Sequence, residues 1–69
     1  MNQILQNIRR LRISKEISQE AIANSLKISQ SAYEKLERGQ TKLSLERYLL
    51  ISVYFDVDKS VLLQDDIQI

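Results

Sequence analysis

The stretch from Gln19 to Arg38, QEAIANSLKISQSAYEKLER, constrains the fold most, because it holds two short amphipathic segments separated by a three-residue break. Ser18 and Ser29 stand directly before the segments, where a hydroxyl can accept a hydrogen bond from the free amides of a first helical turn. The apolar positions have helical spacing. They are Ile22, Leu26, Ile28, Tyr33 and Leu36. Helices this short are not stable alone, so the rest of the chain must supply a core beneath them.

The opposite face of the second segment is entirely polar. It carries Gln30, Ser31, Glu34, Lys35 and Arg38. One helix held on a core, with its outer face free to enter a groove, is the arrangement of a helix-turn-helix. The sequence therefore predicts helices over 19–26 and 30–38, arranged as a helix-turn-helix whose second helix has a free polar face.

Three further helices are predicted, over 2–13, 45–55 and 59–63. Ser44 and Asp58 precede the last two as caps. The inward stripe over 2–13 is Ile4, Ile8 and Leu11, with Leu5 beside it. The inward stripe over 45–55 is expected to be Leu45, Tyr48, Leu49, Ser52 and Phe55. Gly39, the one glycine, can end the helix over 30–38 in a left-handed conformation, and residues 64–69 are expected to be frayed.

The composition excludes several classes of protein. Without cysteine or histidine the chain has no disulfide and no ordinary zinc site. The usual nucleophiles, bases and phosphate-binding loops of enzymes are also missing, so we predict no catalytic residue, no cofactor and no metal. A chain of 69 residues can form only a small core, which favours a dimer. No apolar run approaches membrane-spanning length and no signal-peptide pattern is present, so we expect a cytoplasmic protein without a membrane partner.

The net charge of +1 is unevenly distributed. Residues 1–42 carry eight Lys and Arg against four Glu, whereas residues 43–69 carry two against five acidic residues. Because the basic part contains the predicted reading helix, the acidic part is expected to face away from DNA.

Over roughly residues 4 to 63 the chain resembles the Xre family, the phage-repressor and Cro-like helix-turn-helix proteins. The resemblance rests on the apolar positions of the motif, on the small Ala23 where its helices cross, and on the segments 8–12, 37–39, 44–46 and 56–58. It implies an all-α, compact five-helix lambda-repressor-like domain. It also implies a bacterial or phage-encoded transcription regulator, such as a repressor, that binds double-stranded DNA as a homodimer on a two-fold operator.

The family also implies residue roles. A glutamine at the first position of its reading helix contacts a base, and the glutamine opening the preceding helix braces it and bonds a phosphate; here these are Gln30 and Gln19. The predicted base-reading residues are Gln30, Ser31, Ala32, Glu34 and Lys35. The predicted DNA-backbone contacts are Gln19, Ser29, Arg38, Gln40, Thr41 and Lys42. The alternative for each polar residue is a solvated helix face, and Glu34 can also act by repelling phosphate.

Two structural expectations follow from the same resemblance. Arg12 and Glu37 are expected to form an ion pair that positions the reading helix, rather than to stand as separate solvated charges. Where the family commonly has glycine this chain has Glu16, Lys27 and Asp56, so we expect strained but intact turns at these positions.

The segment 45–55 is apolar nearly all round, because Leu50 and Val53 stand where the family is usually polar and Tyr54 replaces a smaller residue. Such a helix is buried on more than one side, and the second side is most economically another subunit. The predicted dimer interface is Leu50, Val53, Tyr54 and Val61. The alternatives are packing of 45–55 against the last helix and the tail, and a strand formed across the dimer by Ile67 and Ile69.

In a second hypothesis the chain has the same fold but does not read DNA sequence. The chain would then be a protein-interaction module or an antitoxin-type protein that binds a toxin or another partner. Lys27, Glu34 and the low net charge favour it. This hypothesis predicts weak, salt-insensitive DNA binding, whereas a DNA reader loses affinity steeply as salt rises. A phage-type regulator, a restriction–modification controller and an antitoxin all remain open as contexts.

Overall fold

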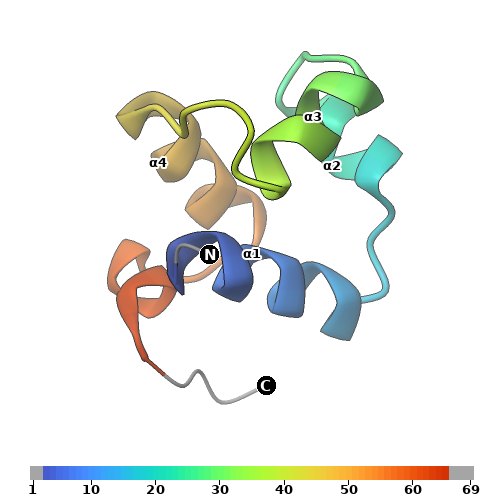
Figure 1. Ribbon diagram of the computed structural model, residues 1–69. Helices are drawn as coiled ribbons and strands as arrows, with labels where there is room; N and C mark the ends of the chain where they lie inside the picture. The colour runs from blue at the N-terminus through green and yellow to red at the C-terminus, as the bar shows by residue number, and fades with distance from the viewer. Residues whose placement is uncertain (1–2, 66–69) are drawn as a thin grey trace.

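The computed structural model describes residues 3–65 and shows four α-helices followed by a short 3-10 helix (Figure 1). The elements are α1 (Gln3–Ser14), α2 (Gln19–Ser25), α3 (Gln30–Glu37), α4 (Leu45–Tyr54) and η1 (Lys59–Leu63). The predicted all-α, lambda-repressor-like fold is confirmed, with the last helix as a 3-10 turn. None of the helices within residues 3–65 is long and apolar enough to cross a membrane.

The helices α2, α3, α4 and η1 begin at the residues that the sequence predicts. Ser18, Ser29 and Ser44 have extended backbones, and each hydroxyl accepts a hydrogen bond of 3.0–3.1 Å from the amide three residues ahead. Asp58 starts η1 by accepting from the Ser60 amide at 2.9 Å. Each cap satisfies a first-turn donor that a helix leaves without a partner.

All four α-helices end in the same motif. The residues Glu16, Lys27, Gly39 and Asp56 are left-handed, with φ of 57°, 60°, 82° and 57° respectively. The amide of each donates three residues back, and the next amide donates five residues back, as in a Schellman motif. Three of the four are not glycine, so the expected strain at these turns is present.

An apolar residue that packs on the core follows each of the three strained residues. Ile17, Ile28 and Val57 each come next in the chain and pack half-buried against the core. This hydrophobic contact commonly accompanies the motif. It explains how the chain keeps a left-handed residue with a side chain at three helix ends.

The core joins the motif to its support. α1 packs against both α3 and η1, α2 packs on α3, and α4 packs on η1 (Figure 1). The buried apolar side chains come from all five elements and their caps. They are Leu5, Ile8, Leu11, Ile22, Ala23, Leu26, Tyr33, Leu36, Ile51, Phe55 and Leu62. The short α2 and α3 therefore rest on the core that they need.

The inward side of α4 differs from the predicted one. Ser52 and Phe55 are buried as expected, but Ile51 is buried with them, and Leu45 and Leu49 are 70% and 38% exposed. Tyr48, Ile51, Ser52 and Phe55 share one face at helical spacing, whereas Leu45 and Leu49 lie on the adjoining stripe with Val53. Because α4 is apolar nearly all round, hydropathy alone did not determine its rotation about its axis.

Asn7 is a fully buried polar residue that the sequence analysis missed. Its amide donates to the carbonyls of Leu62 and Gln64 at 2.9 and 2.8 Å, and its own oxygen accepts from Gln3 at 3.1 Å. These bonds tie the end of η1 to α1. Of the tail expected to fray, residues 66–69 lie outside the described residues, and so does the strand proposed for Ile67 and Ile69.

Replacing each strained residue with glycine tests the cost of these turns. We expect Glu16→Gly, Lys27→Gly and Asp56→Gly each to raise the free energy of unfolding by up to about 1 kcal/mol, since glycine has no penalty at positive φ. Urea unfolding followed by circular dichroism measures the change. Gln6→Gly, at an exposed position inside α1, is the matched control and should lower stability by roughly 0.5–1 kcal/mol. Destabilisation by all four variants would contradict the assignment of strain.

Candidate nucleic-acid interface

α3 is held by its inner face and presents its outer face to solvent. Tyr33 and Leu36 are 0% and 1% exposed. Of the predicted base-reading residues, four are exposed and Glu34 is half-buried. The exposed ones are Gln30, Ser31, Ala32 and Lys35. The structure thus places all five on the side of α3 away from the core.

A buried carboxylate fixes the C-terminal end of α3. The side chain of Glu37 is 4% exposed, and Arg12 grips it with two bonds, from Nε to Oε2 at 2.9 Å and from Nη2 to Oε1 at 3.0 Å. Arg12 and Glu37 therefore form the ion pair that the resemblance implies. The planar, two-point geometry restricts how α3 can rotate against α1.

Three more contacts extend this pair. The Tyr33 hydroxyl donates to Oε2 of Glu37, and the Gln19 amide donates to Oε1 at 3.5 Å. Arg12 also donates to the carbonyl of Ile17 at 3.0 Å, just before α2. The cluster of Arg12, Gln19, Tyr33 and Glu37, here called the Glu37 cluster, thus links α1, α2 and α3.

The hydrogen bonds of the Glu37 cluster keep the Glu37 carboxylate ionised and the Tyr33 hydroxyl protonated. Burial by itself raises the pKa of Glu37, but the hydrogen bonds from Arg12 and Tyr33 outweigh it and hold this pKa below its ordinary value of 4.5. Burial and the bond to Glu37 raise the pKa of Tyr33, so its hydroxyl remains a donor. Within residues 3–65 no buried side-chain nitrogen or oxygen lacks a hydrogen-bond partner. A buried charge arranged in this way is ionised and fully bonded at neutral pH.

The predicted phosphate contacts surround α3. Gln19 is half-buried at the start of α2, and the other five are exposed: Ser29, Arg38, Gln40, Thr41 and Lys42. The Gln19 side-chain amide donates to Glu37, and the bracing of Gln30 and the phosphate contact remain predictions for Gln19.

Glu34 and Arg38 pair with each other across one helical turn. The Arg38 Nη2 and the Glu34 Oε1 are 2.9 Å apart, and both side chains are solvent-accessible. An exposed pair of this kind contributes little stability. It does hold the Arg38 guanidinium beside α3, and it partly offsets the positive charge there.

Most of the chain matches the model of a known protein family. Residues 8–62, from α1 to η1, match the family model described as HTH_3, helix-turn-helix. The chain belongs to this helix-turn-helix family. It is of the Xre, Cro and C1 type, as the sequence resemblance indicates. No curated protein and no solved structure matches the chain. Membership of HTH_3 implies DNA binding, and domains of this family are typically non-catalytic.

The structure adds contacts that the sequence analysis missed. Tyr33 was assigned to the core, and its bond to Glu37 was overlooked; Glu34 was not paired with Arg38. Both pairs stand four residues apart on α3, which is the spacing at which helical side chains meet. That spacing is a signal that could have found them.

Removing the Tyr33 hydroxyl tests the Glu37 cluster. We expect Tyr33→Phe to lower the free energy of unfolding by about 1.5–3 kcal/mol, because the carboxylate loses a buried donor, and to raise the pKa of Glu37. Since the pKa of Glu37 is lower in the folded than in the unfolded chain, the stabilisation is complete above pH 4.5 and is lost as the pH falls through the folded value. The variant should therefore depend less on pH in that acid range.

Urea unfolding between neutral pH and pH 3, with NMR titration of the Glu37 carboxyl carbon, measures both effects. Tyr54→Phe is the matched control, because the Tyr54 hydroxyl makes no hydrogen bond within residues 3–65. Equal stability of the two variants would contradict the role given to Tyr33.

Proposed function

We propose that this chain is a sequence-specific transcription regulator that binds a two-fold DNA operator as a homodimer and reads the major groove with α3. The observation that carries the proposal is the exposed polar face of α3, held in one orientation by the buried Glu37 cluster. A helix that must place side chains on base edges needs this kind of fixed support.

The chemistry of base reading starts at the first turn of α3. Gln30 occupies the first position, where its amide can bond both N7 and N6 of an adenine. Ser31 can serve a base or a phosphate, and the Ala32 methyl can lie against a thymine methyl. One turn further along, Lys35 can reach guanine or the backbone. Glu34 can accept from a cytosine amine or repel phosphate, and it is paired with Arg38.

Phosphate contacts fix the register of α3 in the groove. Gln19 and Ser29 stand at the starts of α2 and α3, and the segment 40–42 follows α3. Together with Arg38 they bracket the reading helix. Bonds from both sides would hold it at a set depth without reading sequence themselves.

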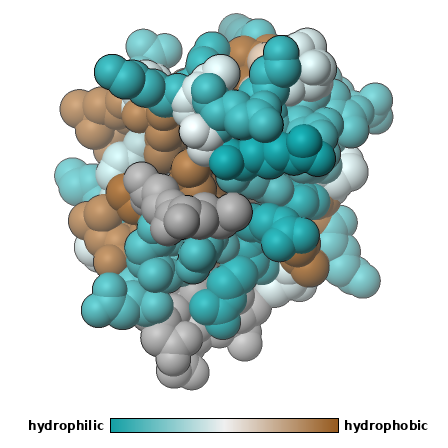
Figure 2. All heavy atoms as spheres, in the orientation of Figure 1, coloured by the Kyte–Doolittle hydropathy of each residue, from teal (hydrophilic) through white to brown (hydrophobic). Residues whose placement is uncertain are grey.

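An apolar surface supports the dimer. Along α4, Leu45, Leu49, Leu50 and Val53 are 70%, 38%, 46% and 75% exposed, and Leu63 of η1 is 57% exposed. We call this set the α4 stripe. Figure 2 shows apolar residues gathered on the side where α4 and η1 lie in Figure 1. Leu45 and Leu49, expected in the core, thus enlarge the surface predicted from Leu50 and Val53. Tyr54 and Val61 of the predicted interface are half-buried.

Pairing two copies through the α4 stripe removes exposed apolar area and adds stability to a small core. The two reading helices of such a dimer would meet half-sites about one helical turn, near 34 Å, apart.

Replacing Gln30 tests base reading. We expect Gln30→Ala to lose base preference at one position of each half-site at a cost of roughly 1–3 kcal/mol, with non-specific binding retained. Fluorescence anisotropy on operator variants, with each base substituted in turn, measures this. Gln6→Ala, at an exposed glutamine of α1, is the control and should leave the preference unchanged. An unaltered preference in Gln30→Ala would remove Gln30 from the reading set.

Charging the α4 stripe tests the dimer. The double variant Leu50→Lys and Val53→Lys should sediment as a monomer and bind operator more weakly, because two ammonium groups would have to be buried at the interface. Ile13→Lys, at a residue of α1 that is 52% exposed, changes the same chemistry away from the stripe and should remain a dimer. A dimeric double variant would place the interface elsewhere.

The alternative function uses the α4 stripe for a different partner. A protein-interaction module or antitoxin would bind a toxin or other protein through it, and α3 would contact DNA weakly or not at all. The salt dependence of DNA binding separates the two, because a reader with several phosphate contacts loses affinity steeply as salt rises.

A further inference from the structure

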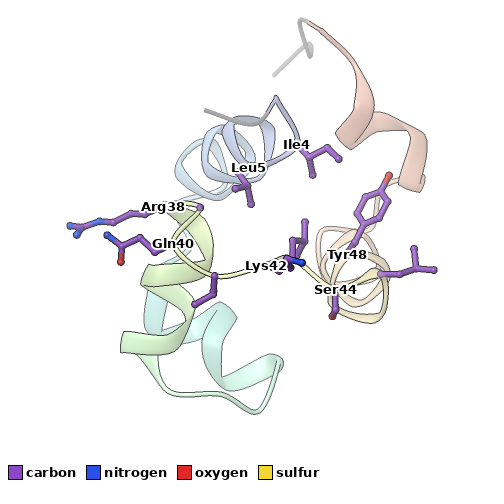
Figure 3. A pocket seen from close by; sticks show the side chains of 11 residues that line it. Ile4, Leu5, Arg38, Gln40, Lys42, Ser44 and Tyr48 are labelled. Carbon is purple, nitrogen blue, oxygen red and sulfur yellow. The ribbon is translucent and has the colours of Figure 1, made fainter.

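A groove lies beside the reading helix, on the side away from α2. It has a volume of about 700 Å³ and runs between the start of α1, the segment 38–44 and the first turn of α4. Its apolar lining comes from Ile4, Leu5, Leu43, Leu45 and Tyr48. Figure 3 shows Leu5 pointing into it from α1. Its size and apolar floor are in the range of small-molecule sites.

The charge around this groove has one sign. Its lining contains Arg38 and Lys42 but no acidic residue. Figure 3 shows Arg38 and Gln40 pointing away from the groove, and Arg38 is paired with Glu34. Lys42 is exposed and has no partner within residues 3–65. It is therefore the cation available to a molecule in the groove.

The backbone of the same segment also has donors to offer. Within the described part of the chain, the amides of Thr41, Lys42 and Leu43 donate to no other group. An ammonium and three amides at the edge of an apolar floor match a molecule with an apolar tail and an anionic head.

We propose that this groove binds a small amphiphilic carboxylate, with its tail against Leu5 and Leu43 and its head group at Lys42. Binding there excludes contact between the segment 40–42 and DNA, because the ligand carboxylate and a DNA phosphate would use the same donors. The groove is then an effector site that lowers operator affinity. This second statement rests on the proposed function, whereas ligand binding itself does not.

Titration of ¹⁵N-labelled protein with octanoate, below its micelle concentration and without DNA, tests the site by NMR. We expect saturable shifts of the amides of residues 39–44 and of Leu5. Octan-1-ol, which has the same tail and no charge, should bind several-fold more weakly, and acetate, which has no tail, should give no saturable shift. Shifts centred on Leu49, Leu50 and Val53, which lie outside the groove, equal binding of octan-1-ol, or no saturation would overturn the site.

Two matched variants locate the head group. Lys42→Gln should weaken octanoate binding by up to about fivefold, the most that an exposed ion pair usually gives, and should leave octan-1-ol binding unchanged. Lys59→Gln, at an exposed lysine of η1 outside the groove, should bind octanoate as the parent does. Equal loss in both variants would overturn the assignment of Lys42.

A DNA competition completes the test. Saturating octanoate should weaken binding to a selected operator, and octan-1-ol should not. Unchanged operator affinity with the groove occupied would overturn the exclusion. A protein that binds octanoate and no DNA would instead contradict the proposed function, while the groove would remain a binding site.

Discussion

The position of α3 depends on the hydrogen bonds that the buried Glu37 carboxylate accepts. A carboxylate this buried is costly unless it is fully bonded, and here it accepts two bonds from Arg12, one from Tyr33 and one from Gln19. These donors come from three helices, so the bonds that keep the charge also set the angle of α3. Rotating α3 away would break some of these bonds and leave a buried charge without its partner, which is strongly destabilising. The Glu37 cluster therefore contributes more to the orientation of α3 than to the net stability of the domain.

The same domain accepts strain at its helix ends. Glu16, Lys27 and Asp56 each occupy a left-handed conformation that glycine adopts freely. Each is followed by an apolar residue that packs on the core, so a buried contact compensates for a local backbone cost. Binding a second copy or DNA would add stability by mass action.

The sequence predicted most of this fold because its signals were local and mutually consistent. Helix starts followed from Ser18, Ser29 and Ser44, and the ends from Gly39 and the positions of the three strained residues. The rotation of α4 about its axis was not predictable, because apolar residues lie nearly all round this helix. Only tertiary packing determines that the face with Ile51 is buried and the face with Leu49 is exposed. Asn7 was missed for a related reason, since its acceptors at 62 and 64 are distant in sequence.

Selection from a random duplex library with the full-length chain, at near-physiological salt, tests the central claim most directly. The account predicts enrichment of a two-fold sequence with half-sites about ten base pairs apart, recovered with lower yield as salt rises. Enrichment of that kind would require both a reading helix and a dimer. Folded protein that enriches no sequence would contradict DNA reading by α3 and would leave the α4 stripe as a surface for a protein partner.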